Sequence, residues 1–281
     1  MPNVTWPKPI EQNSMLFVQL RRHLSLLIRL VGVLLAIAVG AGVFLWYFGL
    51  PLEAGYAATK APVLRERPIP IRDSSVTQSP GRKLAFCGCE YDIPWSDLDE
   101  TKTKVGVNST VLYFDSGLVT LLKCQPPREF VEGVLSSIKV SPENFRRAFG
   151  DSVLQSDYAL TSLMLGMTPD EINFRTPHRY QASKMAMLVL KAMATPRADS
   201  GMFSIHTEQF DGFQYQDPQR MPDWVLLDLF ASDRGLEFQF FLNYHGASPH
   251  VSQADINRVV RTVHKISPYS PLKNTSLKQS H

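Results

Sequence analysis

Residues 30–50 read LVGVLLAIAVGAGVFLWYFGL, and this stretch decides how the rest of the chain is organised. It contains no charged residue, and a helix of this length rises about 30 Å, which is the hydrocarbon thickness of a bilayer. Trp46 and Tyr47 lie near its far end, and such aromatic rings favour the membrane–water interface. Its apolar residues and glycines face every side, which suits lipid better than the interior of a globular protein. We therefore expect one transmembrane helix over residues 30–50.

The charges that flank the span indicate its orientation. Three arginines lie close before it, whereas the first cation beyond it is Lys60. Over about twenty residues the two flanks carry similar positive charge, so proximity alone favours an N-terminus in the cytoplasm. We expect a single-pass protein of the cell membrane whose C-terminal domain lies outside. The three arginines are Arg21, Arg22 and Arg29.

A cleaved signal peptide is the alternative to a retained anchor. Gly55-Tyr56-Ala57 offers the small-x-small pattern of a cleavage site. However, the apolar run is longer than the roughly 7–15 residues of a signal-peptide core, and the leader before it is long. These lengths favour an anchor that stays in the mature protein.

The span divides the chain into five segments. Residues 1–29 are expected to form a basic, mostly disordered cytoplasmic leader, and residues 30–50 the span. Residues 51–80 contain five prolines, which predict an extended, semi-stiff spacer that holds the domain away from the bilayer. Residues 81–267 are long enough for one folded domain with its own core. Residues 268–281 are expected to form a polar tail.

Charge and motifs exclude several classes of function. The whole chain has a net charge of +3, but residues 81–281 carry 21 Lys and Arg against 22 Asp and Glu. A near-neutral domain does not favour binding of nucleic acid, which requires basic residues to neutralise phosphates. The sequence also lacks the glycine-rich phosphate loops, the H-E-x-x-H zinc motif and the G-x-S-x-G nucleophile motif, so no cofactor is expected.

Alternating apolar residues predict strands in two parts of the domain. Residues 83–93 alternate as one strand, followed by a turn at residues 94–100. Asp115-Ser116-Gly117 predicts a hairpin between residues 111–114 and 118–124. Later in the chain, turns at Asp211-Gly212 and residues 231–235 predict two further hairpins. Their strands are residues 202–210 with 213–216, and 224–230 with 236–244.

Capping signals predict a run of helices between the two groups of strands. Residues 127–138, 141–150, 157–166 and 176–194 form this run, and Ser252 caps a last helix. The order of elements indicates an α+β domain in which an antiparallel sheet is covered by helices. The alternation within residues 236–244 indicates that only one face of this sheet is buried.

The three cysteines leave two possibilities open. In an oxidising compartment Cys124 could form a disulfide with Cys87 or with Cys89, which leaves one thiol unpaired. Three reduced cysteines that pack in the core are the alternative. The Cys87-Gly88-Cys89 spacing is too short for the usual zinc or redox motifs.

The polar face of the sheet supplies weak catalytic candidates. His206 and Glu208 lie two residues apart on one expected strand, so their side chains would point the same way. They could meet Glu237, Gln239 or Asn243 of another strand and act as acid and base or as metal ligands. The ordinary interpretation is a solvated outer face, which the alternation predicts without any function.

Asp228 is a further weak catalytic candidate. It shares its strand face with Trp224, Leu226 and Phe230, and apolar surroundings raise the pKa of a carboxyl group. A hydrogen-bonded structural carboxyl group is the ordinary interpretation.

Asp97, Asp99 and Glu100 are weak candidates for a metal site, because hard cations such as calcium take clustered carboxylate oxygens. The segment lacks the spacing and the glycine of a calcium-binding loop, so a charged turn is the ordinary interpretation.

The sequence supports three hypotheses about function. The first is a membrane-anchored extracytoplasmic domain that acts as a binding or assembly module of the cell envelope with a protein partner. The second is a membrane-tethered enzyme, possibly a hydrolase, that uses the polar face of the sheet. The third is a structural subunit of an envelope complex. The sequence shows no catalytic signature, which favours the first, and it does not indicate which small molecule or protein would bind.

Overall fold

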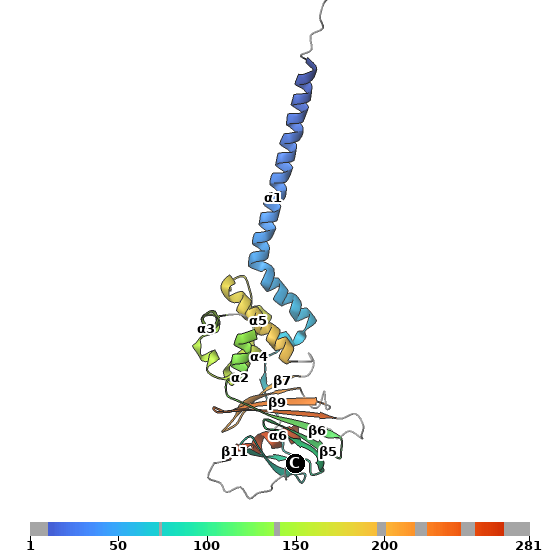
Figure 1. Cartoon of the computed structure of the whole chain (residues 1–281), viewed down its shortest axis with the longest axis vertical. Coiled ribbons are helices and arrows are strands. Elements are labelled where there is room, and N and C mark those ends of the chain that lie inside the picture. The colour runs from blue at the N-terminus through green and yellow to red at the C-terminus, as the bar shows by residue number, and fades with distance from the viewer. Residues whose placement is uncertain are drawn as a thin grey trace, which may run out of the picture.

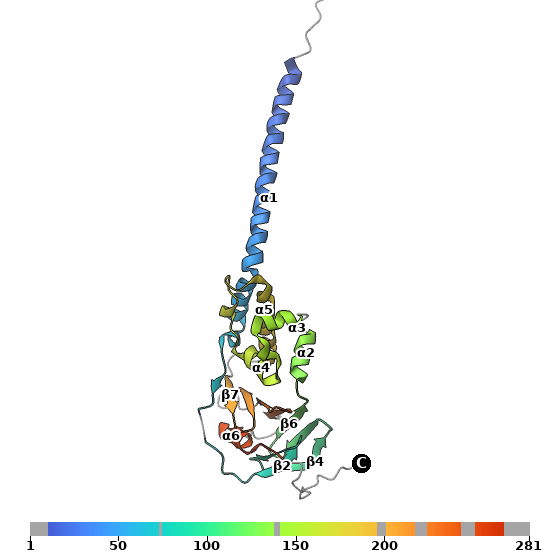
Figure 2. The same ribbon diagram turned by 90° about the vertical axis from the view of Figure 1, so that its left-hand side faces the viewer.

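The computed structural model describes residues 11–72, 75–137, 141–195, 201–216, 224–242 and 251–266. These residues form a long helix followed by three layers that are stacked along the axis of the molecule (Figure 1). The first layer is helical, the second is the main sheet, and the third consists of a small sheet and a helix (Figure 2). The expected fold class, α+β with an apolar N-terminal helix, is confirmed.

The long helix α1 spans Glu11–Lys60 and contains Pro51. Its part from Val31 to Lys60 is long and apolar enough to cross a membrane, and its apolar window is not buried in the protein. A proline inside a helix removes one hydrogen bond and clashes with the preceding turn, and α1 bends near this residue (Figure 1). The expectation that residues 1–29 are mostly disordered is wrong from Glu11 onward, and residues 1–10 lie outside the described residues.

The expected spacer over residues 51–80 is wrong in its first part, because these residues belong to the folded domain. After Pro51, α1 continues to Lys60 and a 3-10 helix follows at Pro62–Arg65. The prolines are tolerated because one lies in the bend and the other lies in the first turn of the 3-10 helix, where its missing N–H is not needed. Buried apolar side chains hold the segment on the helical layer: Ala54, Ala58, Val63 and Leu64.

The main sheet has eight strands in the order β1-β7-β8-β9-β10-β6-β5-β4. It joins the N-terminal and C-terminal groups of strands that the sequence predicts, and the antiparallel pair β10–β6, which the sequence does not predict, connects the two groups. β1 pairs with β7 in parallel, so the sheet is mixed rather than wholly antiparallel. The strands are β1 Ile69–Pro70, β4 Leu98–Val105, β5 Ser109–Phe114, β6 Leu118–Gln125, β7 Met202–His206, β8 Asp211–Tyr215, β9 Trp224–Phe230 and β10 Gly235–Leu242.

The small sheet consists of β2 Arg82–Phe86, β3 Cys89–Ile93 and β11 His264–Lys265. The expected single strand over residues 83–93 is therefore wrong. Cys87 and Gly88 have φ angles of 54° and 68°, which is the left-handed conformation that a tight two-residue hairpin requires. The expected turn at 94–100 is also too long, because β4 already begins at Leu98.

The helices begin and end close to the expected residues. Ser141 accepts a hydrogen bond from the Asn144 backbone N–H at 3.2 Å, and Ser252 forms a capping box with Asp255. Gly150 ends its helix with a φ of 91°, a conformation that favours glycine. The helices are α2 Glu129–Ser137, α3 Pro142–Phe149, α4 Asp157–Gly166, α5 His178–Ala194 and α6 Gln253–Thr262, with 3-10 helices at Asp151–Leu154 and Pro169–Glu171.

The main sheet is covered on both faces, so the expectation of one buried face is wrong. One face packs on β3 and α6 and forms a core with residues such as Phe238, Phe240 and Val259. The other face packs on α2, α4 and α5 and contributes Phe213 and Tyr215 to a second core. The terminal helix thus lies on the opposite side of the sheet from the central helices (Figure 1).

A buried lysine ties the segment that follows α1 to the helical layer. Lys191 on α5 is fully buried, and its Nζ donates to the backbone carbonyl oxygens of Glu66 at 2.5 Å and Met167 at 2.8 Å. Burial lowers the pKa of this lysine to about 8. The residues that follow the span are therefore fixed to the domain by a charged group as well as by apolar packing.

Candidate functional site

The structure separates His206 from Glu208. β7 ends at His206, and Glu208 lies in the turn 207–210, so the two side chains do not share a strand face. The imidazole Nδ1 of His206 pairs with Asp211 instead, in an exposed position. The expected turn at Asp211-Gly212 is wrong for the same reason, since both residues already belong to β8.

His206 also lies far from the polar residues of β10, because β8 and β9 separate β7 from that strand. The expected meeting of His206 and Glu208 with Glu237 or Gln239 does not occur. Asn243 lies outside the described residues.

The three carboxylates near the start of β4 do not form a cluster. Asp97 Oδ2 accepts from the Ser116 backbone N–H at 2.8 Å, and Asp99 pairs with the Lys102 ammonium at 2.7 Å. Glu100 forms an ion pair with Arg82 at 2.5 Å. Consecutive strand residues point to opposite faces, which directs Asp99 and Glu100 apart. Among the described residues no group of three or more His, Cys, Asp or Glu could hold a metal ion.

The structure joins Cys87 to Cys124 in a disulfide with a Cα–Cα distance of 5.8 Å. The disulfide links the hairpin turn of the small sheet to β6 of the main sheet. Cys89 remains a buried free thiol, and its burial raises its pKa.

Asp228 lies at the bottom of a crevice of about 510 Å³ between the helical layer and the main sheet. We call this space the carboxyl crevice. Its floor comes from neighbouring strands β6, β8, β9 and β10 (Lys123, Gln125, Tyr215, Leu226, Asp228, Phe230 and Glu237), and its walls come from α2, α4 and α5 (Glu129, Phe130, Gly133, Val134, Ser137, Thr161, Met164, Leu190 and Ala194).

Strand register brings the polar groups of the floor together. Asp228 on β9 is the direct partner of Glu237 on β10, and Glu237 is the direct partner of Lys123 on β6. Directly opposed residues of an antiparallel pair project to the same face about 5 Å apart. Two carboxyl groups and an ammonium group are therefore aligned across three adjacent strands.

The two carboxyl groups have different surroundings. Glu237 accepts hydrogen bonds from the side-chain amides of Gln125 at 3.1 Å and Gln239 at 2.5 Å. Asp228 is hydrogen-bonded to the Tyr215 hydroxyl. Burial raises the pKa of Asp228 to about 7, and the nearby charge of Glu237 acts in the same direction, against the opposing effects of Tyr215 and Lys123. At neutral pH this carboxyl group can therefore hold or release a proton.

Tyr215 completes the polar floor as a neutral donor. Burial raises the pKa of its hydroxyl group well above the usual value, and the charge of Asp228 raises it further. The hydroxyl therefore keeps its proton and donates to Asp228.

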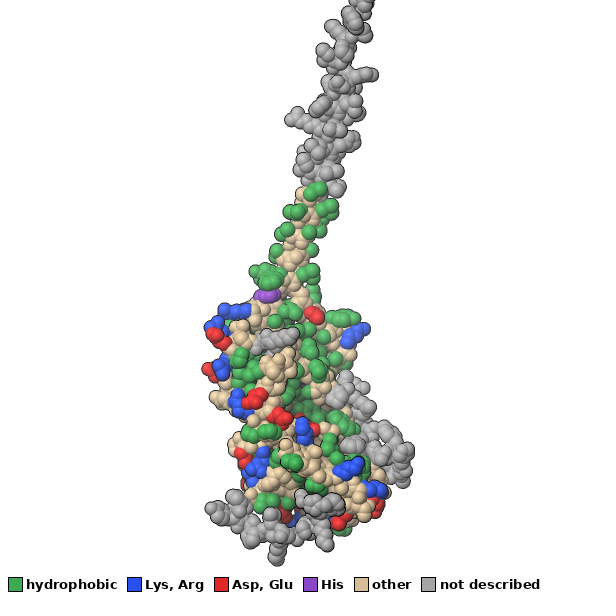
Figure 3. Space-filling view, viewed as in Figure 1, with side chains coloured by type: hydrophobic (Ala, Val, Ile, Leu, Met, Phe, Trp, Pro, Cys, Tyr) green, Lys and Arg blue, Asp and Glu red, His purple; other side chains and the backbone are tan. Residues whose placement is uncertain are grey.

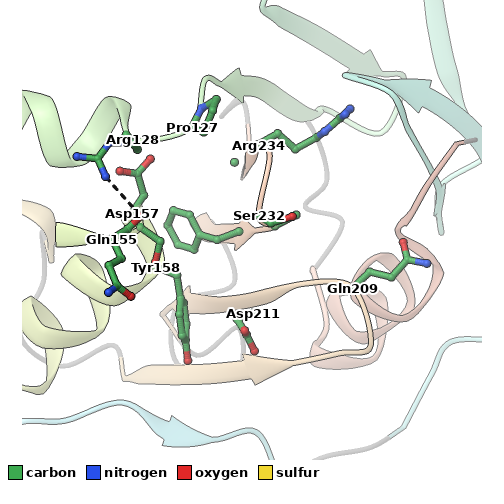
Figure 4. Close-up of a pocket in the computed structure, with 13 residues that line it drawn as sticks. Pro127, Arg128, Gln155, Asp157, Tyr158, Gln209, Asp211, Ser232 and Arg234 are labelled. Atoms are coloured by element: carbon green, nitrogen blue, oxygen red, sulfur yellow. Dashed lines mark hydrogen bonds between the residues drawn. The ribbon is translucent and has the colours of Figure 1, made fainter. Parts of the chain in front are cut away.

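A second pocket lies beyond Phe230 and has a volume of about 300 Å³ (Figure 4). Its charged groups already have partners in the fold. Arg128 Nη1 donates to the Leu154 carbonyl oxygen at 2.8 Å, and the buried Asp157 accepts from the Val131 backbone N–H at 2.9 Å. Figure 4 shows Arg128 and Asp157 grouped on the helical side while Arg234 points away from them. These residues hold α2 to α4, so the carboxyl crevice is the better candidate for a site.

No family model, no curated protein and no solved structure matches this chain. The case for a functional site therefore depends on the geometry of the carboxyl crevice itself.

Asp228 and Glu237 can be named from the sequence, but only as separate candidates. The apolar neighbours of Asp228 on its strand gave the signal for a raised pKa. Lys123 and Tyr215 were missed, because only the register of β6 and β8 brings them beside the two carboxyl groups.

Proposed function

We propose that this protein is a membrane-anchored extracytoplasmic binding module. The carboxyl crevice would hold a small ligand with an apolar body and a cationic or hydrogen-bond-donating end. The observation that carries the proposal is that apolar walls converge on the paired carboxyl groups of Asp228 and Glu237. Ligand sites are typically apolar clefts of roughly 300–1,000 Å³ with a few polar groups that fix orientation.

The packing of α1 supports an anchor that is retained. Cleavage after Ala57 would separate Ala54 from the domain, although both Ala54 and Ala58 are buried against it. The same helix that would cross the membrane therefore ends as part of the folded core. A signal peptide that is removed has no reason to contribute to the core of the mature domain.

The disulfide supports a domain outside the cytoplasm. Disulfides persist in oxidising compartments and are rare in the reducing cytosol. The Cys87–Cys124 bond agrees with the orientation that the arginines before the span favour. Protease treatment of spheroplasts that carry a C-terminal tag tests this orientation, because a tag that survives treatment would place the domain in the cytoplasm.

The chemistry of the crevice favours a ligand with an amine. An ammonium group would replace part of the water around Asp228 and Glu237 and would favour ionised Asp228. The apolar body would contact residues such as Phe130, Met164 and Leu190. Binding of a cation should therefore release a proton from Asp228 and become stronger as pH rises through about 7.

Dansylcadaverine, which joins an aromatic body to a primary amine, is a suitable probe. We expect saturable fluorescence enhancement with the full chain in phosphatidylcholine nanodiscs. Gly133→Phe should weaken binding by about tenfold or more, because the side chain would occupy the crevice. No heavy atom lies within 4 Å of a Cβ built at Gly133, so the substitution introduces no backbone clash.

Gly133→Ala is the matched control, since it changes the same residue but leaves the crevice open. Asp228→Asn combined with Glu237→Gln should remove the preference for dansylcadaverine over a dansylated carboxylic acid of equal length. Equal binding by the Gly133→Phe variant and the unsubstituted protein would show that the probe does not occupy the crevice, and would contradict the proposal.

A tethered hydrolase is the second candidate, and the pKa of Asp228 is the observation that favours it. A carboxyl group with a pKa of about 7 can act as a general acid or base at neutral pH. Asp228→Asn separates the two candidates, because an enzyme would lose turnover of amphiphilic amides or esters while probe binding persists. A panel of such substrates that shows no turnover by the unsubstituted protein counts against the enzyme.

A role in assembly with an envelope protein is a further part of the proposal. Crosslinking of the full chain in intact cells tests it, and recovery of no membrane partner would count against this role.

A further inference from the structure

The N-terminal end of α5 lies beside the far end of the apolar span. The rings of Trp46 and His178 stack with their centroids 4.1 Å apart and an interplanar angle of 14°. Figures 1 and 2 both show α5 next to the place where α1 bends. Figure 3 shows hydrophobic side chains along the described part of α1 and charged side chains starting where α1 meets the domain.

This contact fixes the depth of the α5 N-terminus relative to a bilayer. Trp46 lies four residues before Leu50, where the apolar run ends. At 1.5 Å per residue, Trp46 lies about 6 Å inside that end, which is the depth of the interfacial region. A side chain that stacks on Trp46 lies at the same depth, so residues around His178 must lie at the membrane surface when α1 spans a bilayer.

The exposed residues of this part of the domain suit that position. Phe174 is 66 % exposed, although burial of a phenylalanine side chain is strongly favourable. The Arg175 guanidinium lies 5.6 Å from the Phe174 ring centroid, and the Arg179 guanidinium lies 4.7 Å from that of Tyr180. Aromatic rings together with arginines are typical of segments at the interface, where the rings enter the headgroup region and the cations bind phosphates.

The nearby acids form no described ion pair with these cations. Glu171 forms an ion pair with Arg67 at 3.3 Å. Asp170 is exposed and precedes Phe174 in the chain, and Glu53 is exposed on α1. Arg175 and Arg179 are both exposed, and no described ion pair joins either of them to a carboxylate within 4 Å.

We propose that residues 174–180, the interfacial segment, bind the surface of the bilayer that holds α1. Phe174 enters the headgroup region, and Arg175 and Arg179 bind the phosphates of anionic phospholipids. The proposal depends on the membrane anchoring in the proposed function but not on the carboxyl crevice. Its consequence is that the helical layer is fixed against the bilayer, with the sheet and its crevice on the side away from the membrane.

A fluorescent label at Phe174 tests this contact in the full chain. In the Phe174→Cys variant the new cysteine is labelled with an NBD group. The Val107→Cys variant, labelled in the same way, is the control, since Val107 is 98 % exposed in the turn before β5. The unsubstituted protein measures any labelling of the buried Cys89. Both proteins are reconstituted into vesicles of phosphatidylcholine alone or with about one third phosphatidylglycerol.

We expect NBD at position 174 to emit at shorter wavelength than at 107 and to be quenched about twofold more by a headgroup-labelled nitroxide lipid. Phosphatidylglycerol should strengthen this quenching. Arg175→Gln with Arg179→Gln should remove the effect of phosphatidylglycerol, whereas Arg146→Gln with Arg147→Gln should retain it. The control pair is also exposed, but it lies on α3, where it forms ion pairs with Asp151 and Glu143.

Alkaline extraction of the same vesicles separates failure of this proposal from failure of the anchor. A protein that resists extraction but shows the same water-exposed emission at 174 as at 107 would overturn the lipid contact alone. Extraction into the alkaline wash would overturn both the anchor and the contact. Quenching that is unchanged by phosphatidylglycerol or by the substitutions at Arg175 and Arg179 would overturn the binding of anionic phosphates.

Discussion

The two faces of the main sheet are buried in different ways. The face toward α6 and the small sheet is packed with large apolar side chains, among them Tyr91, Phe238 and Phe240. The face toward the helical layer combines an apolar core with the carboxyl crevice, where Asp228, Glu237 and Lys123 are aligned. The first face leaves little space and few polar groups to act on a ligand, whereas the second retains both. Both faces have an apolar core, but only the face toward the helical layer also has a candidate site.

The largest effect should come from the fully packed face. Phe238→Ala should lower the free energy of unfolding by about 3–5 kcal/mol, because it opens a cavity in a core where the Tyr91 ring lies 5.2 Å away. Urea denaturation of the detergent-solubilised protein, followed by tryptophan fluorescence, measures this change. Probe binding by the protein that remains folded should be unaltered. A loss below about 1 kcal/mol would contradict tight packing around Phe238.

Lys191 tests how the helical layer holds the segment after the span. Lys191→Met should lower the free energy of unfolding at pH 7 by roughly 2–4 kcal/mol, because buried backbone carbonyls of Glu66 and Met167 lose their donor. Limited proteolysis should cut first between residues 60 and 72. Lys184→Met, on a less buried part of the same helix, is the control. Unchanged stability and proteolysis would contradict the role of Lys191 as a tether.

The pH dependence of Lys191 follows from the direction of its pKa. The folded protein releases its proton near pH 8 and the unfolded chain near pH 10.5, so the unfolded state binds more protons between these values. The contribution of Lys191 should therefore make the folded state more stable as pH rises from about 8 to 10.5. Lys191→Met should lack this rise.

The stability of the Asp228→Asn variant at several pH values tests the polar face of the sheet. Its pKa in the folded protein is about 7, against an ordinary value of 3.8, so the folded state binds more protons between these values. The stabilising contribution of Asp228 to the free energy of unfolding is therefore fully present below about pH 4 and is lost as pH rises through 7. Asp228→Asn should raise the free energy of unfolding at pH 8 by roughly 2–3 kcal/mol and have little effect at pH 4.

Asp99→Asn is a control for Asp228, since hydrogen bonds from Lys102 and Thr101 lower the pKa of that carboxyl group. Chemical denaturation at pH 4, 6 and 8 distinguishes the two substitutions. An effect of Asp228→Asn that does not change with pH would refute the raised pKa.

The smallest effect should come from the wall of the crevice. Gly133→Ala should raise the free energy of unfolding by about 0.5–1 kcal/mol, because alanine favours a helix and the added Cβ meets no neighbouring atom. Thermal denaturation of the detergent-solubilised protein measures this gain. Gly212→Ala is a contrasting variant, since its Cβ would lie 2.1 Å from the Asp228 carbonyl oxygen and should destabilise the protein. If Gly133→Ala lowers the free energy of unfolding instead, the added methyl group meets neighbouring side chains, and the crevice has no free space at this position.

Helix ends and most hairpins could be predicted from the sequence because their causes are local. Ser141 and Ser252 supply side-chain acceptors for the first helical N–H groups, and Asp115-Ser116-Gly117 supplies a turn between two apolar strands. The hairpin turn at Cys87-Gly88 was not predicted, because the alternation of apolar residues continues through it. A period of two continues across a two-residue hairpin turn, so the glycine was the one sign that the chain reverses there.

The sequence by itself determined the apolar span, the α+β class and the run of helices between two groups of strands, since these follow from hydrophobicity and short-range hydrogen bonding. The tertiary structure decided three features. It placed residues 51–72 in the domain rather than in a spacer, it buried both faces of the sheet, and it brought Lys123 and Tyr215 beside Asp228 and Glu237. Each depends on pairing between residues far apart in the chain, which the strand register and the packing of layers fix and no local pattern encodes.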